Sequence, residues 1–171
     1  MPPRIRKAVL TAHIATSVGW LGAVLAYLVL DVTATTSQDV QTLRAVYPAM
    51  DLIVRYVIVP LALASVLIGV VNALGTPWGL FRHYWVLSKF LLTLAATAVL
   101  LIETQTVSAL AEQATSSAGP RDLTGTLPHS VGGFLVLLTT TILSVIKPRG
   151  LTRYGWRRQR ELKVRSSAAR P

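Results

Sequence analysis

The 171-residue sequence has no cysteine, few charged residues and few aromatic ones. Without cysteine, the chain cannot form a disulfide, a thiolate metal site, an iron–sulfur cluster or a cysteine nucleophile. Charged residues make up only 14% of the chain and hydrophobic residues 52%, which is too apolar for a soluble domain or a disordered chain. P-loop, GxGxxG and GxSxG patterns are also missing, so nucleotide binding and α/β-hydrolase chemistry gain no support. The composition instead predicts an integral membrane protein.

The apolar residues are gathered into four long runs, separated by polar segments that contain glycine and proline. A hydrocarbon core of about 30 Å needs roughly 20 helical residues at 1.5 Å each. The sequence therefore predicts an all-α fold, an up-down four-helix bundle in the membrane. The bundle domain covers residues 1–147, with spans at about 8–30, 52–74, 84–110 and 128–146, and residues 148–171 form a basic tail. Pro60 is expected to kink the second span.

Basic residues flank the first and last spans. Arg4, Arg6 and Lys7 precede the first span, and most of the remaining positive charge follows Ile146. Because lysine and arginine are enriched on the cytoplasmic side of a membrane, both termini are predicted to be cytoplasmic. The net charge of +10 lies mainly in the juxtamembrane tail, where we expect it to contact anionic lipid headgroups rather than nucleic acid.

Ionisable side chains inside membrane spans are costly and are therefore functional candidates. Counted from the inner ends of their spans, His13 and Lys89 both lie roughly 10 Å deep in the inner half, so they are expected to share one layer. Trp20 shares a helical face with His13, and Trp85 shares one with Lys89. The alternative roles are structural: His13 hydrogen-bonds across a helix interface rich in small residues, and Lys89 extends its ammonium toward the inner headgroups.

A second polar layer is expected near the outer surface. It contains Asp51, Arg55, Glu103 and His129. For Arg55 and Glu103 the simplest role is an ion pair or a contact with lipid headgroups. His13 and His129 lie at depths too different for both to ligate one metal ion, because ligand nitrogens on one ion are only about 4 Å apart.

Two segments, HIATSVGWLGAVLAYL around His13 and HYWVLSKFLLTLAATAVLL around Lys89, resemble the CopD/HemJ superfamily of four-helix bacterial membrane proteins. The chain is most similar to small, largely actinobacterial members that share GTPWGLFRHYWVLSKF and KPRGLTRYG, and the resemblance covers about residues 4–156. In HemJ-type protoporphyrinogen oxidases, a first-span histidine and a third-span lysine are the functional pair associated with haem b. These two residues match His13 and Lys89.

The resemblance implies a multi-pass protein of the bacterial cytoplasmic membrane that binds a b-type haem or related porphyrin between spans one and three. His13 would ligate the haem iron, Lys89 would be a second ligand or a catalytic base, and Trp20 and Trp85 would line the pocket. Haem reactivity depends on the axial ligand and the polarity of the pocket. Both electron transfer and porphyrin oxidation by a haem-dependent oxidoreductase therefore stay open.

Two other functions compete with haem binding. One is a cofactor-free scaffold or accessory subunit, whose small-residue faces pack against a second copy or a partner subunit. The other is a small ion, proton or copper transporter, in which Arg55, Glu103 and His13 form a path. Copper is the weaker cargo, because Cu(I) prefers sulfur ligands and the chain has only two methionines.

Overall fold

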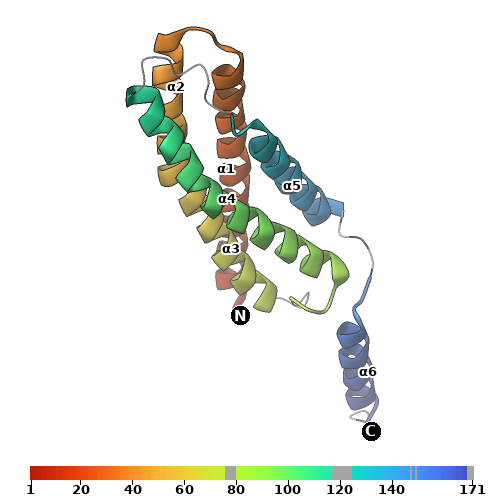
Figure 1. Cartoon of the computed structure of the whole chain (residues 1–171). Helices are drawn as coiled ribbons and strands as arrows, with labels where there is room; N and C mark the ends of the chain where they lie inside the picture. The colour runs from red at the N-terminus through yellow and green to blue at the C-terminus, as the bar shows by residue number, and fades with distance from the viewer. Residues whose placement is uncertain (76–79, 117–124, 147, 149, 169–171) are drawn as a thin grey trace.

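The computed structural model describes residues 1–75, 80–116, 125–146, 148 and 150–168. This part of the chain is all-α and contains no strand, apart from a single β-bridge between His83 and Leu151. Its helices, shown in Figure 1, are α1 (Pro3–Thr36), α2 (Val40–Ile53), α3 (Val59–Leu74), α4 (Tyr84–Ser116), α5 (Leu127–Ile146) and α6 (Arg153–Ala168). A π-helical turn, η1 (Val54–Ile58), joins α2 to α3 without a break.

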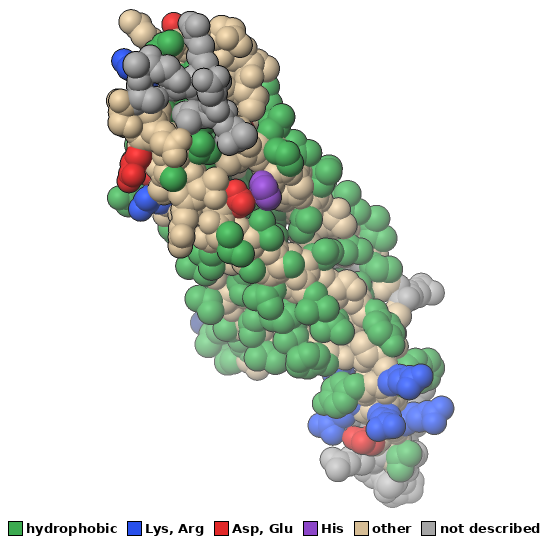
Figure 2. All heavy atoms as spheres, in the orientation of Figure 1, with side chains coloured by type: hydrophobic (Ala, Val, Ile, Leu, Met, Phe, Trp, Pro, Cys, Tyr) green, Lys and Arg blue, Asp and Glu red, His purple; other side chains and the backbone are tan. Residues whose placement is uncertain are grey.

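Four helical segments are long and apolar enough to cross a membrane: α1, the continuous α2–η1–α3 segment, α4 and α5. Only 11–17% of the apolar stretch in each segment is buried inside the chain. Large hydrophobic side chains are exposed along all four segments, and they cover most of the middle of the face in Figure 2. Water-soluble proteins rarely expose so large a contiguous apolar surface, so this surface suits contact with lipid.

The helices extend beyond the predicted spans. The segment 31–50, expected to connect spans one and two, is almost wholly helical, because α1 continues to Thr36 and α2 begins at Val40. The side chain of Asp39 caps α2 by accepting a hydrogen bond from the Thr42 amide at 2.8 Å. A kink is expected at Pro60, which has no amide donor, and the π-helical turn η1 ends two residues before this proline, at Ile58. The predicted domain boundary at residue 147 lies outside the described residues.

The four long segments make a ring of contacts. Helix α1 packs against α2, η1, α3 and α5, and α4 packs against α2, α3 and α5. In the described part of the chain, α1 and α4 share no extensive contact. These two helices therefore lie diagonally across the bundle, which matters because His13 is on α1 and Lys89 is on α4.

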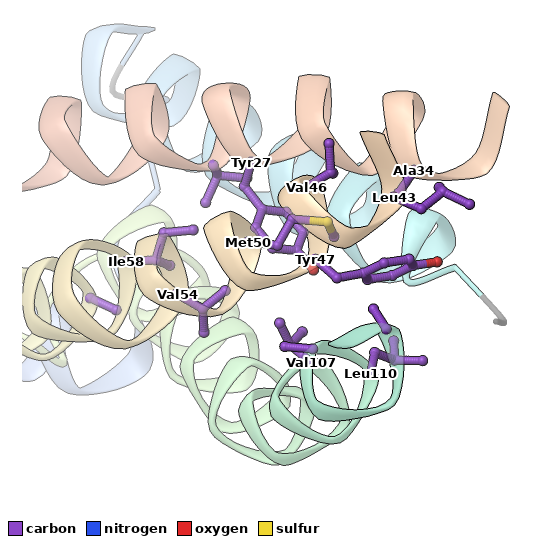
Figure 3. Close-up of a cluster of buried hydrophobic side chains, with 14 of the residues drawn as sticks. Tyr27, Ala34, Leu43, Val46, Tyr47, Met50, Val54, Ile58, Val107 and Leu110 are labelled. Atoms are coloured by element: carbon purple, nitrogen blue, oxygen red, sulfur yellow. The ribbon is translucent and has the colours of Figure 1, made fainter. Parts of the chain in front are cut away.

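The tightest core lies where α2 passes between α1 and α4 (Figure 3). Leu43, Tyr47 and Met50 of α2 are only 0–2% exposed. The same cluster includes Tyr27 and Ala34 of α1 and Val107 and Leu110 of α4. This core holds together the end of the bundle farthest from Met1, which lies beside Gly75 at the other end.

Helix α6 is attached beside the beginning of α4. The hydroxyl of Thr152 donates to the carbonyl oxygen of Phe81 at 2.6 Å, and the Thr152 amide donates to that of Arg82 at 3.0 Å. The same hydroxyl accepts the Gly155 amide at 3.0 Å, so Thr152 caps the N-terminus of α6. A Cβ atom on Gly155 would overlap the Arg82 carbonyl oxygen, so this close approach requires glycine.

Candidate functional site

His13 lies in the contact between α1 and α3. A Cβ atom added to Gly69 of α3 would come within 2.9 Å of the imidazole Cε1, so the missing side chain at Gly69 makes room for the ring. One turn further along α1, the Ser17 hydroxyl hydrogen-bonds that of Ser65 on α3 at 2.9 Å. The His13 Nδ1 is buried and has no hydrogen-bond partner among the described residues.

Lys89 reaches from α4 toward α5. Its ammonium donates to the Ser144 hydroxyl at 2.5 Å, and that hydroxyl donates to the Thr140 carbonyl oxygen at 2.8 Å. Lys89 is also close enough to His13 to interact with it electrostatically, although their helices are diagonal. The ammonium is thus held by the α4–α5 contact, whereas the imidazole is held by the α1–α3 contact.

The four residues of the predicted outer layer form two separate pairs. The Arg55 Nε donates to the Asp51 Oδ1 at 2.8 Å, and the Ser108 hydroxyl of α4 donates to the same oxygen at 2.6 Å. The Nε2 of His129, on α5, lies 3.6 Å from the Oε1 of Glu103, on α4. The first pair therefore links the second span to α4, and the second pair links α4 to α5.

A buried carboxylate that the sequence analysis did not single out lies near the C-terminal end of α1. Asp31 is 0% exposed, and its Oδ2 accepts hydrogen bonds from the hydroxyls of Ser130 at 2.7 Å and Thr126 at 3.0 Å. Because Thr126 has only one hydroxyl proton, the hydroxyl of Tyr27 is the donor in its 2.7 Å contact with Thr126. The Asp31 Oδ1 has no partner among the described residues. These contacts tie α1 to the beginning of α5.

The sequence does contain a signal for this cluster. Trp20, Val24, Tyr27 and Asp31 are all buried, and they follow one another at spacings of three or four residues on α1. This spacing places them on one face of a helix. In the sequence, Asp31 directly follows the first apolar run, but in the structure it continues the buried face of α1.

A partly enclosed cavity of about 350 Å³ lies between all four spans. Its size falls within the range of roughly 300–1,000 Å³ that is common for ligand sites. Most of its wall is apolar, and its polar side chains are Tyr27, Glu103, Thr104, Thr126, His129 and Ser130. A Cβ atom on Gly132 or Gly133 would meet nothing within 4 Å, so these two glycines leave part of the α5 wall open.

The cavity does not coincide with the pocket expected from the sequence. Of His13, Trp20, Trp85 and Lys89, only Trp20 lines it in the described part of the chain. His13 is packed against α3 and Lys89 hydrogen-bonds to Ser144 of α5, so neither side chain lines this cavity. Haem ligation by these residues stays a prediction. The described residues also contain no cluster of three or more histidine, aspartate or glutamate side chains that could hold a metal ion.

Comparison with known proteins adds no assignment. No protein-family model, curated protein or solved structure matches the chain. The resemblance to the CopD/HemJ superfamily therefore stays an expectation that depends on the segments around His13 and Lys89.

Proposed function

We propose that the chain is a multi-pass protein of the bacterial cytoplasmic membrane that binds a lipid-soluble molecule inside its helix bundle. The cavity between the four spans is the observation that supports this function. A scaffold that only joins partners gains nothing from an unfilled interior, because the lining atoms lose dispersion contacts there. An apolar wall with a few polar side chains is also the usual character of a site for a small amphipathic ligand.

We further propose that the bundle is up-down, with both termini in the cytoplasm. The N-terminus and α6 lie at the same end in Figure 1, and both carry basic residues. Arg153, Arg157 and Arg158 of α6 would then lie beside anionic lipid headgroups. The polar side chains of the cavity would lie in the outer half of the membrane. His129 and Gly132 are exposed and also line the cavity, so a ligand would enter from the lipid on that side.

A b-type haem is the second candidate ligand. It is favoured by the resemblance and by the buried Nδ1 of His13, since an imidazole nitrogen is a common axial ligand of haem iron. The contact of the His13 ring with Gly69 would have to open before His13 could serve in this way. Absorption spectra of the purified protein and of His13→Ala, prepared with an adequate haem supply, test this candidate. A Soret band that disappears in His13→Ala would support it.

The cavity itself is tested by filling it. Gly133→Leu places a side chain where a Cβ atom meets no neighbour inside the cavity, so the variant is expected to fold and to exclude the ligand. Gly22→Leu is the matched control, because a Cβ atom there also meets nothing, but Gly22 faces outward from α1 and does not line the cavity.

Organic extraction and mass spectrometry of protein purified in lipid nanodiscs measure the bound small molecules. We expect wild type and Gly22→Leu to release an apolar molecule in amounts close to one per chain, and Gly133→Leu to release little of it. Equal release from all three proteins would reject ligand binding in the cavity.

A further inference from the structure

The ionisable groups around the cavity are mostly acidic. Glu103 lines the wall, and its side chain is only 21% exposed. Asp31 lies directly behind the wall, because both of the hydroxyls that donate to it, from Thr126 and Ser130, belong to lining residues. Among the described lining residues there is no lysine or arginine, and only His129 can become positive.

The two carboxylates act on the same part of the cavity. Both Asp31 and Glu103 are close enough to the Tyr27 side chain to affect it electrostatically. Tyr27 lines the cavity and is 6% exposed, and Trp20, which is 3% exposed, lines it two turns earlier on the same face of α1. Indole and phenol rings attract cations to their faces, most strongly where water is excluded.

The hydroxyl groups near Asp31 are already occupied. Tyr27 donates to Thr126, while Thr126 and Ser130 donate to Asp31, so none of these three protons is free for a ligand. The Glu103 carboxylate has only the 3.6 Å contact with His129 in the described part of the chain. The polar group left to bind a ligand at this end of the cavity is therefore the carboxylate of Glu103, which is negatively charged and accepts hydrogen bonds.

We infer that the cavity binds a hydrophobic organic cation, with its positive charge beside Glu103 and its apolar groups against Trp20 and the α4 and α5 walls. This inference rests on the proposed function, because it names the charge of the molecule that the cavity takes. A low local dielectric strengthens the attraction between the carboxylate and the cation. The same carboxylate disfavours anions and gives a neutral molecule of equal shape no comparable gain.

An isosteric series of probes separates charge from shape. Tetraphenylphosphonium, tetraphenylsilane and tetraphenylborate share one shape and carry charges of +1, 0 and −1. Their binding is measured by competition against radiolabelled phosphonium in nanodiscs that contain the protein, with empty nanodiscs as the background. We expect the phosphonium to bind most tightly and the borate least tightly.

Four variants then identify the groups that bind. Glu103→Gln is expected to weaken phosphonium binding roughly 10- to 100-fold, because it removes the coulombic attraction between the carboxylate and a cation several ångströms away. Glu103→Asp, which keeps the charge, should retain most of the binding. His129→Ala should not weaken it, because His129 is the one described lining residue that can become positive and oppose a cation. Gly133→Leu should weaken binding of the phosphonium and of the silane alike.

The outcomes separate this inference from the proposed function. The silane could bind as tightly as the phosphonium, with binding that is lost in Gly133→Leu but unaffected by Glu103→Gln. This result would overturn the cation preference and keep the cavity as a binding site. Equal weakening by Glu103→Gln and His129→Ala would mean that the pair acts only as a structural link, and would also overturn the inference. Binding of all three probes that is indifferent to Gly133→Leu would overturn both proposals.

Discussion

Gly155→Ala is expected to detach α6 from the bundle. A Cβ atom at this position would overlap the Arg82 carbonyl oxygen, and a backbone oxygen cannot rotate away as a flexible side chain can. Separating the two backbones breaks the bonds from Thr152 to Phe81 and Arg82, and the bond from the Tyr84 amide to the Gly150 carbonyl oxygen. Each of these three bonds contributes roughly 0.5–1.5 kcal/mol, so the loss is about 1.5–4.5 kcal/mol.

Helix propensity alone predicts the opposite effect of Gly155→Ala on stability. Alanine is better than glycine inside a helix by roughly 0.5–1 kcal/mol, so Gly155→Ala would stabilise α6 if it met no neighbour. The contact with Arg82 is expected to dominate, because the hydrogen bonds that it breaks are worth more than this gain. Gly150→Ala is the control, since its Cβ atom would lie at an ordinary 3.8 Å from the Tyr84 ring.

Hydrogen–deuterium exchange in nanodiscs reads the Thr152 and Tyr84 amides directly, because both donate across this contact. In Gly155→Ala their exchange should accelerate roughly tenfold to a thousandfold, given that each 1.4 kcal/mol corresponds to a factor of ten. In Gly150→Ala it should stay near the wild-type rate. Unchanged or slower exchange in Gly155→Ala would refute the assignment of this contact as the anchor of α6.

Two further predictions concern stability in the membrane, measured as the free energy of unfolding in mixed micelles. Met50→Ala is expected to cost about 2–5 kcal/mol, because it opens a cavity in the core. Leu67→Ala is the control and should cost far less, because Leu67 is 67% exposed. Equal costs would contradict the placement of the core around α2. Asp31→Ala is expected to cost about 1–3 kcal/mol because the Thr126 hydroxyl loses its buried acceptor, while Asp31→Asn keeps a carbonyl acceptor and should cost less. An equal loss in the two Asp31 variants would mean that the charge, and not the hydrogen bond, stabilises the cluster.

The four apolar helices could be predicted from the sequence because length and hydrophobicity are local properties. About 20 apolar residues suffice to cross the membrane core wherever they occur. The ends of the helices could not be predicted in this way. Residues 31–50 are helical because Asp39 caps α2 and because Tyr47 and Met50 pack between α1 and α4, and the packing depends on partners far away in the sequence.

The sequence could predict how deep each site residue lies along its helix, but not which way its side chain points around the helix axis. Counting residues along a helix gives height at 1.5 Å per residue, which is enough to suggest that Glu103 and His129 lie in one layer. It does not tell which neighbour a side chain faces. His13 faces Gly69, and Lys89 faces Ser144, because α1 and α4 are diagonal in the bundle. That pairing of helices is a property of the tertiary packing alone.

The diagonal placement of α1 and α4 also explains why the bundle has a cavity. Near Met50, the side chains of α2 fill the space between α1 and α4, and the core is tight there. Beside the cavity, the described part of the second span contributes only Val54 and Ile58 of η1, and the facing residues include the small side chains of Ala95, Ala96, Gly132 and Gly133. Small residues on facing helices normally bring the backbones together. Here α1 packs on α3 and α5 instead of on α4, so the same residues leave an opening that Glu103 lines, with the carboxylate of Asp31 behind its wall.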